Sequence, residues 1–385
     1  MRRSSTFAAY NIAYYKMYLK NISLINFKSY ENAELTFSPK LNCLAGNNGM
    51  GKTNMLDAIY YLCLCKSSFN LSDLQNIRYN QDFFVIQGGF NRNEQTENIY
   101  CGIKRNSKKI FKRNNKEYER LSDHIGLFPV VMISPSDSSL IIEGSEERRK
   151  FINSVISQYD KLYLDNCIQY NKALNQRNRL LKDFARVGNF NSELLEIWDI
   201  QLINLGEKIY QRRVEFISEL LPVFQHYYEF VSLGHEKVEL EYRSQLHHTP
   251  FKQLLEQSQE KDRILQFTTT GIHKDDLLLH LDGFPIKKSG SQGQQKTYLV
   301  ALKLAQFDFL KNINNIKPIL LLDDIFDKFD RQRVKQIIKL VADENFGQIF
   351  ITDTSSERLE EILTSTSIDY KFFTVKDNGE IELKQ

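Results

Sequence analysis

The sequence predicts an α/β fold: a core with a mixed sheet and helices, built from both chain ends, with an inserted helical domain. Three features predict this fold. A glycine-rich phosphate-loop pattern occupies residues 46–53, an apolar strand ending in two carboxylates occupies residues 318–324, and a long helical stretch lies between them. About 270 residues separate the two motifs, yet both must meet at one phosphate. The helical stretch must therefore loop out of the core.

The composition is that of an ordinary globular protein. The 385 residues are 42% hydrophobic and 26% charged, with 17 Gly and 7 Pro, which excludes disordered and collagen-like chains. No apolar run approaches the roughly 18 residues of a membrane helix, so we expect no membrane partner and a cytoplasmic protein. The net charge of +3 does not by itself indicate nucleic acid. Five cysteines at irregular spacing favour reduced core thiols over a metal site or disulfides.

The pattern of apolar residues along the chain divides it into four segments. Residues 1–16 form an extension expected to be disordered, and 17–144 form the N-terminal part of the core, with a helix at Asn54–Cys65, hairpins over 83–120 and a buried strand at Val130–Ile133. Residues 145–267 form the helical arm or lid domain, with a turn near Val187–Asn191. Strands and helices alternate again over 268–385, the C-terminal part of the core.

Residues 46–53 fit the phosphate-loop pattern G-x-x-x-x-G-K-[ST]. They follow a predicted strand, Leu41–Leu44, and open a predicted helix, a context that favours this interpretation over a structural glycine turn. Backbone N–H groups in such a loop bind phosphate, so we expect ATP here, with Lys52 on the β- and γ-phosphates and Thr53 on Mg²⁺. The expected cofactor-binding residues are Gly46, Asn47, Asn48, Gly49, Met50, Gly51, Lys52, Thr53 and Asn54.

The strand Pro318–Leu322 ends in Asp323 and Asp324. A buried strand ending in carboxylates suits a magnesium-binding element of a phosphate-loop ATPase. We expect Asp323 to hold Mg²⁺ through water and Asp324 to orient or deprotonate the attacking water. Asp324 and Lys52, the latter through its contact with the phosphates, are the expected catalytic residues. The alternative is a strand that ends in a solvated acidic turn.

A third segment, Ser289–Lys296, precedes the helical run Thr297–Leu310. Ser291 and backbone amides at a helix N-terminus form an anion site, although a polar turn with a helix cap fits the pattern equally well. Because the chain already has its own phosphate loop, a second such site suggests contact with a neighbour's ATP. The segment resembles the signature motif of ABC ATPases, in which Ser291, Gly293 and Gln294 would contact nucleotide across a dimer.

Further segments extend this resemblance. Asn26–Tyr30 is similar to the start of the RecF/SMC-like ABC ATPases, as are Ser134–Asp137 with Gly144–Phe151, and Thr270–Leu277. Together they match the RecF family from Met17 to the C-terminus, and the helical arms are too short for an SMC protein. The resemblance implies an ABC-type ATPase core, an ATP-bound homodimer, weak DNA-stimulated ATPase activity and binding at single-strand gaps and ss/ds junctions. It also implies partnership with RecR, and often RecO, in loading RecA.

Four positions depart from the ABC pattern. Asp324 replaces the usual Glu, which fits slow hydrolysis used as a switch, and Asp327–Asp330 is not the usual D-loop sequence. Thr352 and Asp353 stand where transporters place a switch His, and Ser134–Asp137 lacks the Q-loop Gln, leaving Asp137 as a candidate sensor.

A basic cluster is the candidate DNA surface, although a solvated hairpin rim explains it equally well. Its members are Lys104, Arg105, Lys108, Lys109, Lys112, Arg113 and Lys116. Other basic residues, namely Arg148, Arg149, Lys150, Arg177, Arg179 and Lys182, are interpreted as ordinary helix-surface charge. Trp198 is interpreted as a core residue and His273 as structural, although the family resemblance also implies a role for His273 in coupling.

Two other functions are compatible with an ATPase core. The subunit of a transporter or another non-DNA ABC machine would require the Q-loop Gln and the switch His, and both are missing. A nucleolytic defence ATPase would require a further acidic domain, for which the length leaves no room.

Overall fold

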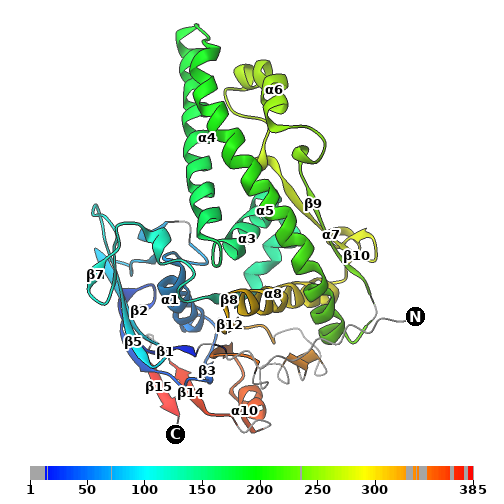
Figure 1. Ribbon diagram of the computed structural model, residues 1–385. Coiled ribbons are helices and arrows are strands. Elements are labelled where there is room, and N and C mark those ends of the chain that lie inside the picture. The colour runs from blue at the N-terminus through cyan, green and yellow to red at the C-terminus, as the bar shows by residue number, and fades with distance from the viewer. Residues whose placement is uncertain are drawn as a thin grey trace.

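Two six-stranded sheets enclose helix α1, and a helical insert rises from the other side of the second sheet (Figure 1). The structure is a computed structural model. It describes residues 14, 16–70, 72–234, 236–326, 333–334, 336–337, 345–364, 368–376 and 380–384. The expected extension, residues 1–16, lies almost wholly outside these residues, as does the D-loop segment Asp327–Asp330.

The first sheet is antiparallel, in the order β2-β1-β4-β5-β6-β7. It confirms the predicted hairpins over 83–120, because β4, β5, β6 and β7 follow one another along that stretch. The strands are β1 (Met17–Phe27), β2 (Tyr30–Thr36), β4 (Phe83–Arg92), β5 (Gln95–Lys104), β6 (Ile110–Arg113) and β7 (Lys116–Glu117).

The second sheet joins the two ends of the chain, in the order β15-β14-β3-β13-β12-β8, with only β15 antiparallel. Its central strands are apolar on both faces: Ile319 and Leu321 pack toward α1, whereas Leu320 and Leu322 pack toward the insert. Such strands read as continuous apolar runs because both faces of a parallel sheet are covered. The strands are β3 (Leu41–Ala45), β8 (Val130–Ile133), β12 (Ile319–Asp323), β13 (Ile349–Asp353), β14 (Tyr370–Val375) and β15 (Ile381–Lys384).

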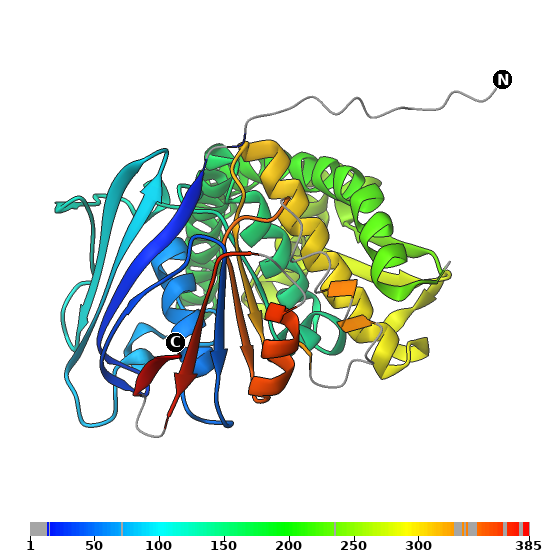
Figure 2. The ribbon, with the colours of Figure 1, turned by 90° about the horizontal axis from the view of Figure 1, so that it is seen from below.

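Helix α1 (Lys52–Leu64) lies between the two sheets, as Figure 2 shows from below. Its apolar residues, among them Met55, Ile59 and Leu62, are buried on both sides. The helix starts two residues before the predicted start, at the lysine of the phosphate loop. The core therefore fixes the position of this helix N-terminus, where phosphate is expected.

The insert confirms the predicted helical arms. The turn between α4 and α5 falls at 188–191, with Gly188 in the left-handed region, and α5 continues through Pro222 to Ser232. Helix α5 then packs along α8 (Gln292–Asn314) through Phe224 and Tyr298, whose ring centroids are 4.7 Å apart. The helices are α2 (Ser139–Ile142), α3 (Ser145–Ile156), α4 (Lys161–Val187), α5 (Ser192–Ser232) and α6 (Phe251–Leu265).

A three-stranded sheet, β11-β10-β9, closes the base of the insert. Strand β9 (Val238–Arg243) pairs with β10 (Asp276–Leu281), so this sheet spans the predicted boundary at 267/268. The division into domains stays a prediction, and the pairing favours a boundary further along the chain. The remaining elements are β11 (Phe284–Pro285), α7 (Ile286–Ser289) and α10 (Ser356–Thr364).

The interpretation of the arm arginines as surface charge is wrong at three positions. Arg148 makes two bonds to the Asp276 carboxylate, at 2.7 and 3.1 Å, and Arg149 donates to the Asp275 carbonyl at 2.6 Å. Arg177 is fully buried and pairs with Asp199 and Asp262. The carboxylates offset the desolvation of Arg148 and Arg177, whereas the partner of Arg149 is a main-chain carbonyl. Lys150, Arg179 and Lys182 are exposed, as predicted.

The remaining sequence expectations concern buried side chains. The five cysteines are free and buried, as predicted. His273 is mostly buried against Tyr170, and burial lowers its pKa to about 4, which supports a structural role. Trp198 is only half-buried, on the edge of the core.

Within the part of the chain that the structure describes, no helix has the length and hydropathy needed to cross a membrane.

Candidate nucleotide-binding site

The phosphate loop connects β3 to α1. Gly49 and Gly51 have φ angles of 83° and 109°, values that only glycine adopts without strain. A Cβ on Gly51 would lie 2.7 Å from Ser29 Oγ. Lys52 is 3% exposed, and its Nζ donates to the carbonyls of Gly46 at 2.7 Å and Asn47 at 3.0 Å. The ammonium is thus held over the loop, where phosphate oxygens can replace these carbonyls.

The turn between β1 and β2 supports the loop from behind. Tyr30 donates to the Gly51 carbonyl at 2.9 Å, and Asn54 donates to Ser29 Oγ at 2.8 Å. Lys28 pairs with the buried carboxylate of Asp57 at 2.6 Å. Asn54, expected to bind the cofactor, is therefore engaged with this turn. Sequence reasoning used Asn26–Tyr30 as a family marker without recognising this supporting role.

The two motifs from opposite chain ends meet at Thr53 and Asp323. Thr53 Oγ1 lies 2.9 Å from both carboxylate oxygens of Asp323, and Thr352 donates to the same carboxylate at 2.8 Å. Burial raises the pKa of Asp323, an environment that favours a neutralising cation. Among the described residues there is no group of three or more His, Cys, Asp or Glu that could hold a metal. The Thr53 hydroxyl and the Asp323 carboxylate are oxygen ligands side by side, and this suits Mg²⁺, which commonly takes one or two protein ligands and completes its shell with phosphate and water.

Asp324 begins the turn after β12, half-buried, with φ 44°. Its N–H donates to Thr352 Oγ1 at 3.0 Å, so one threonine fixes both members of the acidic pair. The sequence analysis noted Thr352 only because it stands where transporters place a switch His. It did not predict that Thr352 contacts both Asp323 and Asp324. The neighbouring Asp353 is paired with Arg358 at 3.0 Å.

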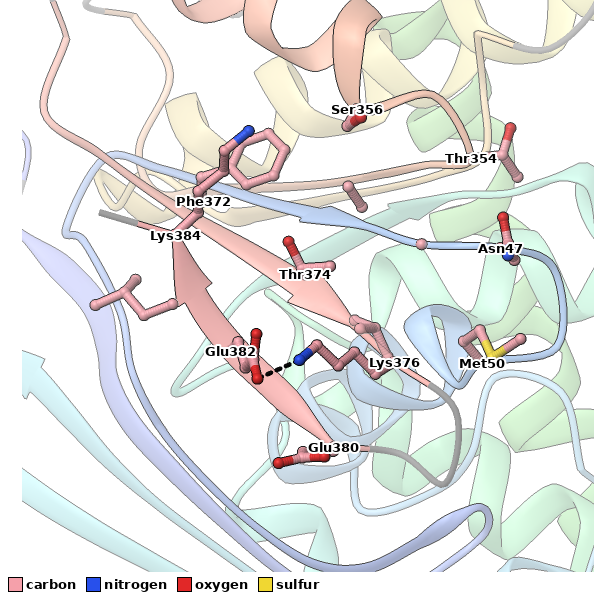
Figure 3. A pocket seen from close by; sticks show the side chains of 14 residues that line it. Asn47, Met50, Thr354, Ser356, Phe372, Thr374, Lys376, Glu380, Glu382 and Lys384 are labelled. Atoms are coloured by element: carbon pink, nitrogen blue, oxygen red, sulfur yellow. Dashed lines mark hydrogen bonds and ion pairs between the residues drawn. The ribbon is translucent and has the colours of Figure 1, made fainter.

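A pocket of about 810 Å³ opens beside the phosphate loop (Figure 3). Gly46, Asn47 and Met50 form one wall, and the hairpin β14–β15 forms the other, with an ion pair between Lys376 and Glu382. Its size lies within the roughly 300–1,000 Å³ range of small-molecule sites. The loop therefore has an adjoining polar space, lined also by Thr354 and Thr374, of a size that suits the rest of a nucleotide.

The signature segment lies apart from the chain's own phosphate loop. Helix α8 begins at Gln292, earlier than predicted, and Ser291 is its N-cap. Ser291 Oγ accepts from the Gln294 N–H at 3.2 Å, and Gln294 Oε1 accepts from the Ser291 N–H at 2.8 Å. Helix α7, which directly precedes this segment, lies on the opposite side of Figure 1 from α1. Ser291 is thus an exposed helix cap.

Asp137 forms an ion pair with helix α8, which begins within the signature segment. Its carboxylate pairs with Lys303 of α8 at 2.8 Å and accepts from the Ser134 N–H at 2.8 Å. The segment that replaces the Q-loop therefore contacts α8 through one ion pair. This link is compatible with the sensor role predicted for Asp137.

The structure divides the basic cluster. Lys104, Arg105, Lys108 and Lys116 are exposed. Lys109 instead donates to the Cys65 carbonyl at 2.8 Å and pairs with Asp73 at 2.7 Å, Arg113 pairs with Glu97, and Lys112 lies over the Tyr100 ring. Phe111 is buried and does not offer a ring to bases. The accessible charge therefore lies mainly at the end of β5 and in the loop that follows it, with Lys104, Arg105 and Lys108, whereas Lys116 lies at the other end of β6.

Comparison with known proteins identifies the family. The family described as "RecF/RecN/SMC N terminal domain" matches residues 18–372. A protein of Bacteroides thetaiotaomicron described as "DNA replication and repair protein RecF" is 57% identical over 95% of this chain and 98% of its own length. The chain belongs to the RecF family. A RecF of Flavobacterium johnsoniae is 50% identical over 93% of this chain and 100% of its own.

Solved RecF structures have the same fold. RecF with ATP, described as a recombination mediator of the RecFOR pathway, superposes with a TM-score of 0.87 at 29% identity over 98% of this chain and 100% of its own. An Smc head domain from Pyrococcus furiosus, at 17% identity and a TM-score of 0.55 over 96% of each chain, shares the fold alone. The predicted ABC-type ATPase fold and RecF membership are thus confirmed, and a transporter subunit is not supported. The roles of individual site residues stay predictions.

Proposed function

We propose that this chain is an ATP-dependent DNA-binding protein of recombinational repair and replication restart. Bound to ATP, it forms a homodimer on single-strand gaps and ss/ds junctions, and slow hydrolysis releases it. The observation that carries the proposal is the meeting of Thr53 and Asp323 beside the phosphate loop, in a chain 57% identical to a protein named for DNA replication and repair.

Each site residue has a proposed role. Lys52 and the backbone of residues 46–53 bind the β- and γ-phosphates, and Thr53 and Asp323 hold Mg²⁺, which would neutralise phosphate charge. Asp324 orients the attacking water. The side chain of Asp324 is one methylene shorter than Glu, which suits weak, DNA-stimulated hydrolysis that acts as a timer.

The signature segment completes the site of a second copy. The exposed cap at Ser291, with Gly293 and Gln294, presents a helix N-terminus to the γ-phosphate bound by the other chain. The preceding helix α7 lies on the opposite side of Figure 1 from α1, which supports this action in trans. By family membership we also propose RecR, with RecO, as partners that promote RecA loading.

Mass in solution tests the proposed switch. Light scattering should show a monomer without nucleotide and a dimer with ATP and Mg²⁺, formed more readily on gapped duplex DNA than on blunt duplex of the same length. A mass indifferent to both ATP and DNA would contradict the proposal.

The exposed part of the basic cluster should contribute to DNA affinity through phosphate contacts. Lys104→Ala/Arg105→Ala should weaken binding on every sequence and flatten the dependence of log K on log salt by about two, at about 0.9 per phosphate contact. The control is Lys252→Ala/Lys261→Ala, two exposed lysines on α6. Equal salt slopes for wild type and the Lys104/Arg105 variant would show that this surface does not bind DNA.

A further inference from the structure

Glu236, in the loop between α5 and β9, joins the long arm helix to the signature segment. One carboxylate oxygen accepts from Gln294 Nε2 at 2.5 Å. The other accepts from the Tyr228 hydroxyl at 2.8 Å. Tyr228 belongs to α5 and Gln294 to the first turn of α8, so a single side chain bridges the two helices where they meet.

Helix α5 also fixes the backbone of Glu236. Gln225 Nε2 donates to the Glu236 carbonyl at 3.2 Å, and Gln225 Oε1 accepts from the Val238 N–H at 2.9 Å. Gln225 and Tyr228 thus hold the backbone and the side chain of Glu236 from neighbouring turns of one helix. The carboxylate is therefore positioned by α5 and does not depend on a freely moving loop.

Gln294 sets the geometry of the Ser291 cap. While its Nε2 is held by Glu236, its Oε1 accepts from the Ser291 N–H and its backbone N–H donates to Ser291 Oγ. Because Ser291 Oγ is the acceptor in its bond with the Gln294 N–H, the hydroxyl can still donate its hydrogen to an incoming anion. The first N–H groups of a helix likewise have no partner within the helix. The Ser291 hydroxyl and the first N–H groups of α8 are therefore hydrogen-bond donors that are already in position before an anion binds.

We infer that Glu236 is a positioning residue that holds Gln294, and through it the Ser291 hydroxyl, in the geometry that receives the γ-phosphate of a second copy's ATP. The inference rests on the proposed function of the signature segment in trans. It adds that the arm helix α5 supports the signature segment through Glu236, because Gln225 and Tyr228, which hold Glu236, both belong to α5.

Glu236→Ala tests the inference. Affinity of the monomer for ATP, measured by titration with a fluorescent ATP analogue below the dimerisation concentration, should be unchanged because the phosphate loop is untouched. The dissociation constant of the ATP-bound dimer should rise roughly 100-fold, which is about tenfold for the hydrogen bond to a charged group that each of the two copies loses, and turnover should fall in parallel. Glu236→Gln retains an amide oxygen for Gln294 and should restore dimerisation. Glu241→Ala, at an exposed glutamate on β9, is the matched control.

A double-mutant cycle separates positioning from general stability. In a Gln294→Ala background, Glu236→Ala should have no further effect on dimerisation, whereas a purely structural loss would add to it. A wild-type dimerisation constant for Glu236→Ala, or failure of Glu236→Gln to rescue a defect, would overturn the inference while leaving the proposed function intact. If wild type itself forms no ATP-dependent dimer, the proposed function fails first.

Discussion

Lys52→Ala should abolish nucleotide binding. The Lys52 ammonium is buried at the mouth of the phosphate loop and, among the residues that the structure describes, is bonded only to carbonyls that phosphate oxygens can replace. Because hydrogen bonds to charged groups contribute about 1.5–3 kcal/mol each and about 1.4 kcal/mol is tenfold in affinity, losing two such bonds should weaken ATP binding by roughly 100-fold or more. Equilibrium titration with ATP and Mg²⁺ measures the change.

The control for this substitution is Lys20→Ala, at an exposed lysine on β1. Thermal unfolding of both variants should resemble wild type, since the Gly46 and Asn47 carbonyls are only partly buried and water can reach them. Unchanged ATP affinity in a folded Lys52→Ala protein would remove the assignment of residues 46–53 as the phosphate loop.

The nucleotide core was predictable because its signals are local. The strand before the phosphate loop, the apolar run before Asp323 and the strand Val130–Ile133 each reveal their structure within a few residues, and the structure places all three in one sheet. Even the distant pairing of Thr53 with Asp323 followed from chemistry, since both motifs must serve one phosphate.

Polar partners distant in sequence were not predictable. Arg177 finds Asp262 85 residues away, and Arg148 finds Asp276 128 residues away, so nothing near either arginine distinguishes it from surface charge. Lys109 and Arg113 are likewise removed from the basic cluster by Asp73 and Glu97. A cluster of basic residues in a sequence therefore predicts accessible charge only where the fold does not bring carboxylates to pair with them.

Ser291→Arg should block ATP-dependent dimerisation and turnover while leaving nucleotide binding to the monomer intact. Ser291 is exposed at the α8 N-terminus, and α7, which precedes it, lies across the molecule from α1, so a larger side chain there should not disturb the chain's own phosphate loop. The arginine removes the N-cap and places a long cation where the proposed dimer brings a second copy's ATP. Light scattering with ATP and Mg²⁺, together with phosphate release, measures the result.

Ser218→Arg is the matched control, because Ser218 is an exposed serine on α5. It should dimerise and hydrolyse ATP as wild type does. If Ser291→Arg also gives a normal ATP-dependent dimer, the signature segment is only a helix cap. If Ser291→Arg instead loses nucleotide affinity as a monomer, Ser291 acts on its own chain and the proposed action in trans is wrong. The proposed arrangement allows one result: the Ser291→Arg monomer keeps its affinity for ATP and the ATP-dependent dimer is lost. In that arrangement each chain binds the phosphates with its own phosphate loop, and the signature segment of the second copy contacts them only afterwards.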